Sequence, residues 1–205
     1  MMYRYDHSIH HRKSIRLKDY DYSQAGAYFV TICTKNKECL LGDVVDGKMQ
    51  FNKYGQIVER EWLRTGIIRQ NVQIDEFVVM PNHIHVIIVL NDVVGATRWV
   101  AQNKTIPNRA IHRIAPTFQS NSIGAIIGQF KSIVTKKINL IRSTPGAPLW
   151  QRNYYEHIIR NEGDMNGIRE YVMNNTLRWI EDENNPVNLK TVKHGHRGLT
   201  IQKGG

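Results

Sequence analysis

Residues 72–90, VQIDEFVVMPNHIHVIIVL, contain two strand-like runs, 72–80 and 83–90. Only Pro81 and Asn82 separate the runs, and so short a connection favours an antiparallel pair. Successive side chains of a strand point to opposite faces, and apart from its two histidines the second run is apolar throughout, so both of its faces should be covered. The stretch therefore predicts a central strand and its neighbour in an antiparallel sheet.

The flanking sequence predicts the other elements of an α+β domain. We expect a buried strand at 27–34, a hairpin across 40–52 turned at Asp46-Gly47, helices at 55–68 and 121–140, a strand at 154–160, and a helix from Asp164 to about Ile180. With the inserted hairpin set aside, the order is β-α-β-β-α-β followed by a helix, which is the ferredoxin-like, split βαβ arrangement. We divide the chain into a basic arm at 1–24, one domain at 25–183 and an irregular tail at 184–205.

The charge distribution predicts a polyanionic partner. The formal net charge is +10, from 28 Lys and Arg against 18 Asp and Glu. Residues 93–155 contain no acidic residue, and such a stretch favours a phosphate-binding surface over an ordinary solvated face. The candidate DNA-binding residues are Arg12, Lys13, Arg16, Arg109, Arg113, Lys131, Lys136, Lys137 and Arg152.

Cysteine content and hydropathy predict a cytoplasmic protein. Cys33 and Cys39 are too few for a disulfide framework or a four-cysteine zinc site, and a reducing compartment fits them. The longest apolar stretch, around residues 86–90, is far shorter than the roughly 20 residues of a membrane helix. We expect a bacterial, nucleoid-associated protein without a membrane partner.

His83 and His85 form a candidate metal site. The period of two places both imidazoles on one face of the strand, about 6–7 Å apart, which is a workable spacing for two ligands of one divalent ion. On the spacing alone, partly exposed strand-end histidines without a ligand are the more common explanation. A third ligand is needed to favour a metal.

The expected C-terminal helix carries a second candidate pair, Tyr171 and Asn175. With Ile168, Val172 and Trp179, they share one helix face that should pack toward the sheet. Burying an asparagine in an apolar stripe costs free energy unless its amide finds partners. A metal beside the sheet would be coordinated by the Asn175 carbonyl oxygen, and the Tyr171 hydroxyl would then lie near the same ion. The alternative is a core tyrosine next to an asparagine that is hydrogen-bonded to the backbone.

These motifs together resemble the single-tyrosine HUH transposases, and within them the REP-associated tyrosine transposases. The similarity runs from about Arg12 to Trp179 and includes PNHIHVI at 81–87, IIGQFKS at 126–132 and PLWQRNYYEH at 148–157. The resemblance implies that His83 and His85 are the paired metal ligands, Asn175 the third ligand and Tyr171 the nucleophile. It also implies substrates of single-stranded DNA with hairpin-forming, palindromic elements, and a monomer or homodimer, of which we expect the monomer.

The chemistry of a phenol explains why such a site needs a metal. A phenol with a pKa near 10 is a poor nucleophile at pH 7, so cleavage needs positive charge at the phosphate. Nitrogen and oxygen ligands suit Mn²⁺ or Mg²⁺. By resemblance, attack would leave a 5′-phosphotyrosine and a free 3′-hydroxyl, whose rejoining needs no energy cofactor.

Two further residues and two rival functions complete the sequence-based expectations. Glu156 and His157, on the strand before the tyrosine helix, are candidates for a supporting or proton-transfer role. A non-catalytic module for single-stranded nucleic acid is the alternative function, although the glycine–aromatic signatures of RNA-recognition domains are absent from the sequence. A metal-dependent phosphohydrolase that uses water is the other.

Overall fold

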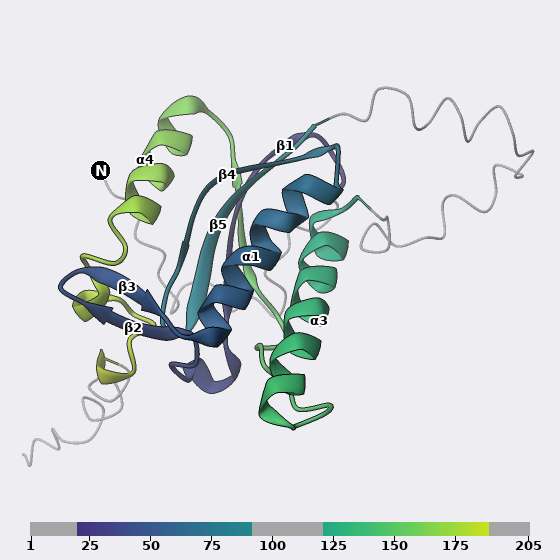
Figure 1. The fold of residues 1–205 in the computed structure, drawn as a ribbon. Helices are drawn as coiled ribbons and strands as arrows, with labels where there is room; N and C mark the ends of the chain where they lie inside the picture. Colours follow the sequence, from purple (N-terminus) through teal and green to yellow (C-terminus); the bar gives the residue numbers. More distant parts are fainter. Residues whose placement is uncertain (1–19, 92–120, 189–205) are drawn as a thin grey trace, which may run out of the picture.

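The computed structural model describes residues 20–91 and 121–188, which form an α+β fold (Figure 1). The elements are β1 (Gly26–Cys33), η1 (Lys35–Lys37), β2 (Gly42–Val45), β3 (Lys48–Phe51), α1 (Lys53–Ile68), β4 (Val72–Val79), β5 (His83–Leu90), α3 (Ile123–Arg142), β6 (Tyr155–Ile159), α4 (Glu162–Met173) and η4 (Trp179–Glu181). The antiparallel four-stranded sheet has the order β4-β5-β1-β6, and β2 and β3 form a separate hairpin. The predicted ferredoxin-like fold is therefore confirmed.

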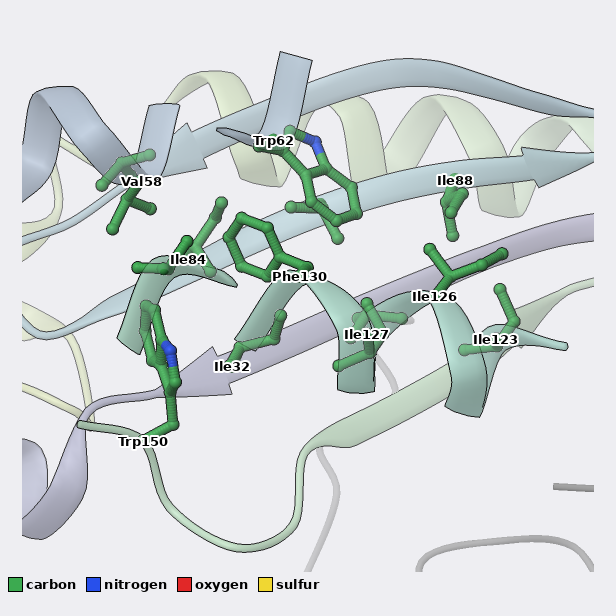
Figure 2. Packing of buried hydrophobic residues seen from close by; sticks show 14 of the residues in the cluster. Ile32, Val58, Trp62, Ile84, Ile88, Ile123, Ile126, Ile127, Phe130 and Trp150 are labelled. Atoms are coloured by element: carbon green, nitrogen blue, oxygen red, sulfur yellow. The ribbon is translucent and has the colours of Figure 1, made fainter. Parts of the chain in front are cut away.

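Helices cover both faces of this sheet. Helices α1 and α3 lie side by side on one face and α4 lies on the other (Figure 1). The larger core joins Ile84 and Ile88 of β5 to Ile127 of α3 and Trp62 of α1 (Figure 2). Each fully buried isoleucine contributes about 1.5–3 kcal/mol. The smaller core, Phe29, Ile87, Ile159 and Val172, attaches α4 to the opposite face, the one that carries both histidines.

Local signals define the predicted hairpin turn and also the starts of α1 and α3. Asp46 and Gly47 both have positive φ, 50° and 70°, as a tight two-residue hairpin turn requires. Asn52 caps α1 by accepting from the backbone of Tyr54 and Gly55. Ser122 caps α3 through Ala125. These caps fix the residues at which the two helices begin.

The tyrosine-bearing helix is shorter than expected. Its N-cap is Asn161, whose side chain accepts from the amide of Asp164, and it ends at Met173 rather than near Ile180. Asparagine is a poor helix former, and Asn174 ends the helix as its C-cap. The expected single helix face carrying both Tyr171 and Asn175 was therefore wrong, because Asn175 lies in the turns beyond the helix.

Ordered packing extends past both ends of residues 25–183. Tyr22 belongs to the larger core, and Asn184 and Asn185 are buried at the other end. Among the described residues, no helix has the length and apolar character needed to cross a bilayer. The candidate DNA-binding residues Arg12, Lys13, Arg16, Arg109 and Arg113 lie outside the described residues.

Candidate active site

The two histidines of β5 converge on one point. His83 and His85 lie on the face of the sheet covered by α4 and are 0% and 3% exposed. Their Nε2 atoms are 3.0 Å apart and their rings are nearly perpendicular. Two nitrogens bound to one ion at about 2.1 Å lie roughly 3.0–3.4 Å apart, so this separation fits a pair of metal ligands.

Asn82 determines which nitrogen of His83 is available. Its Nδ2 donates to the carbonyls of Lys37 and Asn184, at 2.9 and 2.7 Å, and this orients the amide. Its Oδ1 therefore faces His83 Nδ1 at 2.8 Å, where it accepts a hydrogen bond from the Nδ1–H. The Nε2 of a neutral His83 is then an acceptor directed at the shared point, as a metal ligand requires.

Thr31 has the same relation to His85. The two residues face each other across β1 and β5, and Thr31 Oγ1 lies 2.8 Å from His85 Nδ1. Burial lowers the pKa of His83 to about 3, and burial and the neighbouring His83 lower the pKa of His85 well below its ordinary value. Both rings are therefore neutral at pH 7. If the Nδ1–H of His85 donates to Thr31 Oγ1, the Nε2 atoms of His83 and His85 both carry lone pairs that point at each other. A cation bound between them would relieve that repulsion.

Asp182 is a third donor that the sequence did not reveal. It follows η4, is 9% exposed, and places Oδ2 3.8 Å from His83 Nε2. The ligand atoms of His83, His85 and Asp182 all lie within 4.8 Å of one another. Two imidazoles and a carboxylate are a donor set that divalent ions accept, so the residues present fit a metal. Nothing local in the sequence marks Asp182, because its position depends on how the chain returns after α4.

Tyr171 reaches the same cluster from α4. Its hydroxyl is 3.2 Å from His85 Nε2, and its ring packs edge-on against Phe29 and against His85. The residue as a whole is 40% exposed, so it lies at the edge of the buried cluster. Burial, with the nearby Asp182 and Glu183 carboxylates, raises the pKa of Tyr171 to about 12, although a hydrogen bond with Asn175 lowers it in part.

Asn175 lies beside this tyrosine despite the early end of the helix. It is 2% exposed, and its Oδ1 has no hydrogen-bond partner among the residues that the structure describes. An orphaned buried carbonyl oxygen costs about 1–3 kcal/mol unless a group outside the chain satisfies it. Asn175 thus provides a second independent observation that fits a cation.

An ion pair holds α4 in place against the sheet. Arg169 donates from Nε and Nη2 to the two carboxylate oxygens of Asp75, at 2.7 and 2.6 Å. Asp75 lies where the register of β4 shifts between Ile74 and Phe77, and such a bulge redirects side chains. The hydrogen bonds from Arg169 lower the pKa of Asp75. This contact is two residues from Tyr171 and joins α4 to β4.

Replacing Arg169 by glutamine should make the stability of the protein less dependent on acidic pH. The pKa of Asp75 is lower in the folded protein than in the unfolded chain, so the ion pair stabilises the fold fully above about pH 4–5. That stabilisation fades as the pH falls toward the lowered pKa. Urea unfolding between pH 6 and pH 3 should show a wild-type advantage that narrows on acidification. Arg160→Gln, an exposed control just before α4, should show no such gap, and a pH-independent gap would contradict the assignment.

The remaining candidates are distributed over both faces. Glu156 is buried opposite Val30 on the α1–α3 face, so it points away from the histidines. His157 lies on the histidine face, where its Nε2 pairs with Asp164 at 3.0 Å near the start of α4. Neither residue is in hydrogen-bond contact with His83 or His85 among the contacts of the described residues.

Four candidate DNA-binding cations are described. Lys137 pairs with the buried Glu61 and so links α3 to α1. Lys131 is half-buried and donates to the carbonyls of Gln151 and Arg152. Lys136 and Arg152 are exposed. The last two therefore remain the described cations with freedom to meet a phosphate.

A close sequence relative is found in Haemophilus influenzae. An uncharacterized protein of that organism is 41% identical over 186 residues, which cover 89% of this chain and 98% of the relative. The chain belongs to the same family as this Haemophilus protein. No protein-family model matches the chain.

Two solved structures show remote similarity. A REP-associated tyrosine transposase bound to a REP hairpin is 20% identical, covers 80% of this chain and 73% of its own, and gives a TM-score of 0.45. A protein of Deinococcus radiodurans assigned as a transposase is 17% identical, covers 78% of this chain and 97% of its own, and gives a TM-score of 0.35.

Proposed function

We propose that this chain is a metal-dependent, single-tyrosine endonuclease and transposase that cleaves and rejoins single-stranded DNA at hairpin-forming, REP-like sequences. One observation carries the proposal: the Tyr171 hydroxyl lies 3.2 Å from His85 Nε2, which is itself 3.0 Å from His83 Nε2. A nucleophilic side chain and a pair of metal-ligating nitrogens thus share one point, as the resemblance to HUH transposases implies. A plain core tyrosine has no need of such neighbours.

In this mechanism Tyr171 attacks the phosphorus of one phosphodiester. The new bond joins the phenolic oxygen to phosphorus, the bond from phosphorus to the 3′-oxygen breaks, and the proton lost by the phenol is balanced by one gained at the 3′-oxygen. A bound divalent ion supplies positive charge that stabilises charge developing on a nonbridging phosphate oxygen. His83 and His85 would hold that ion, while the Arg169–Asp75 ion pair fixes the helix and Phe29 packs against the ring of Tyr171.

Two oxygen donors compete for the third ligand position. Asn175 is the ligand that the sequence resemblance implies, and the Asp182 carboxylate is the one that geometry adds. Neutral ligands would leave the metal site with a net charge of +2, whereas the Asp182 carboxylate would reduce the net charge to +1 and weaken the attraction of the phosphate.

The metal is Mn²⁺ or Mg²⁺, both of which accept imidazole nitrogen and oxygen ligands.

The position of a label on the DNA tests the proposal. The substrate is a library of DNA hairpins with randomised single-stranded flanks, labelled at the 3′ end or at the 5′ end, with Mn²⁺, Mg²⁺ or chelator. We expect the 3′ label to move onto the protein in a denaturing gel, because the tyrosine retains the 5′-phosphate. The 5′ label should remain in a shorter free strand. Cleavage without an adduct would indicate a water-using hydrolase, and binding without cleavage a non-catalytic module.

Replacing Asp182 by asparagine identifies the third ligand. The variant keeps an oxygen that can accept from the Asn184 amide, as Asp182 Oδ1 does at 2.6 Å, but loses the charge. If Asp182 holds the ion, Mn²⁺ affinity measured by calorimetry should fall by about 10–100-fold. Glu183→Gln, an exposed neighbour that removes the same charge, should leave the affinity unchanged. Unchanged affinity in Asp182→Asn with a loss in Asn175→Ala would assign the position to Asn175.

A further inference from the structure

A large cavity lies away from the histidines, between the C-terminal half of α3 and the segment 143–152. Its volume is about 820 Å³, within the range of about 300–1,000 Å³ that is typical of ligand sites. The lining includes Lys131, Lys136, Leu140, Trp150 and Arg152. In Figure 1 this region is at the lower end of α3. None of the residues discussed above as holding the metal or the tyrosine lines it.

The walls of this cavity, which we call the α3 groove, are positively charged. Its lining contains Lys131, Lys136 and Arg152 and no aspartate or glutamate. Lys131 Nζ donates to the carbonyls of Gln151 and Arg152, and these hydrogen bonds join α3 to the segment 143–152. Lys136 and Arg152 are exposed, and within the described residues neither has an ion-pair partner. These two side chains are placed to meet phosphates.

The same groove presents apolar surface to a ligand. Leu140 is 83% exposed, and Pro145 and Pro148 continue the apolar lining beside it. Trp150 is 6% exposed, yet its buried indole Nε1–H has no acceptor among the described residues. Apolar side chains next to cations suit nucleotides, whose bases can pack against the apolar surface while their phosphates pair with lysine and arginine.

The groove is continuous with the active-site end of the sheet. The Gln151 amide donates to the Cys33 carbonyl at 2.9 Å, and Thr34 pairs with Trp150. Cys33 in turn lies directly opposite His83 in the β1–β5 ladder. Two strand spacings of about 4.8 Å therefore separate the backbone of the groove wall from that of His83. A few unpaired nucleotides can span this distance around the β6 edge.

We propose that the α3 groove binds unpaired nucleotides of the DNA substrate adjacent to the scissile phosphate. The proposal rests on the function proposed above and adds a second contact site to it. Lys136 and Arg152 bind backbone phosphates, and the surface formed by Leu140 and the two prolines receives bases. The groove thereby selects DNA that is single-stranded beside the hairpin, since a paired strand cannot offer its bases to this wall.

Binding without metal tests the groove separately from cleavage. The full chain is titrated in chelator with two labelled DNA hairpins, one blunt and one with a single-stranded extension, and anisotropy gives both affinities. We expect the extension to strengthen binding by wild type. Arg152→Glu combined with Lys136→Glu should reduce this extension-dependent gain by about tenfold or more, because two phosphate contacts are lost. Arg160→Glu, at the opposite end of β6, should retain the increase in affinity that the extension provides.

Photocrosslinking places the extension directly. Leu140 and Ile67 are 83% and 82% exposed on α3 and α1, so each tolerates replacement by benzoylphenylalanine. The extension should crosslink at position 140 and not at the matched position 67. The groove proposal would be overturned if the double variant lost affinity equally for the blunt and the extended hairpin and no crosslink formed at position 140. This would hold even if the protein cleaves DNA. Groove-dependent binding by a protein that forms no adduct would instead overturn the proposed cleavage and leave the groove in place.

Discussion

Tyr171→Phe is expected to abolish strand cleavage and the covalent adduct while leaving DNA binding intact. The substitution removes one oxygen atom from a ring that keeps its contacts with Phe29 and His85. That oxygen is the attacking atom, and loss of a nucleophile costs other enzymes on the order of 10⁴-fold or more in rate. Within the part of the chain that the structure describes, Tyr171 is the tyrosine whose hydroxyl is in hydrogen-bond contact with His85.

The measurement uses the hairpin library with Mn²⁺, labelled at the 3′ end to follow the adduct and at the 5′ end to follow the released strand. Wild type and Tyr171→Phe are compared for adduct, for released strand and for affinity by anisotropy. Tyr155→Phe is the matched control, because Tyr155 also packs against Phe29, at 6.4 Å between ring centroids, from the neighbouring strand. Cleavage by Tyr171→Phe at the wild-type rate would remove Tyr171 from the mechanism and indicate attack by water.

His85→Ala is expected to eliminate both metal binding and cleavage. It removes the imidazole that lies between His83 and Tyr171, with contacts of 3.0 and 3.2 Å, and leaves at most one histidine for the ion. Mn²⁺ affinity should fall by more than the roughly 10–100-fold typical of losing a supporting contact. Binding of DNA in chelator should persist, because phosphate contacts by lysine and arginine supply most non-specific affinity.

The buried position of His85 makes a folding control necessary. The substitution leaves a cavity beside Thr31, so circular dichroism should verify that the sheet forms before calorimetry with Mn²⁺. His157→Ala on β6 serves as the comparison, because its Nε2 contacts Asp164 at the start of α4 rather than the histidine pair. If His157→Ala lost metal binding as completely as His85→Ala, a residue of β6 would have to be counted among the metal ligands.

Local patterns in the sequence determined the sheet and one half of the site. The period of two along 83–90 put His83 and His85 on one face, and the apolar residues on both faces identified β5 as a covered strand. Asp46-Gly47 specified its hairpin because few dipeptides accept two positive φ values. These features depend on neighbours within a few residues, so they can be predicted from the chain alone.

Only the tertiary structure decided how the other half of the site is assembled. Helix α4 ends at Met173 because Asn174 caps it, and the turns that follow bring Asn175 beside Tyr171 and Asp182 beside His83. The amide of Asn82 selects the free nitrogen of His83 through the Lys37 and Asn184 carbonyls, which lie far away in the sequence. Such contacts depend on where the chain returns after packing. Periodicity and resemblance therefore identified His83, His85 and Tyr171 as candidates, whereas the position of Asp182 and the orientation of each ring could not be predicted from the sequence.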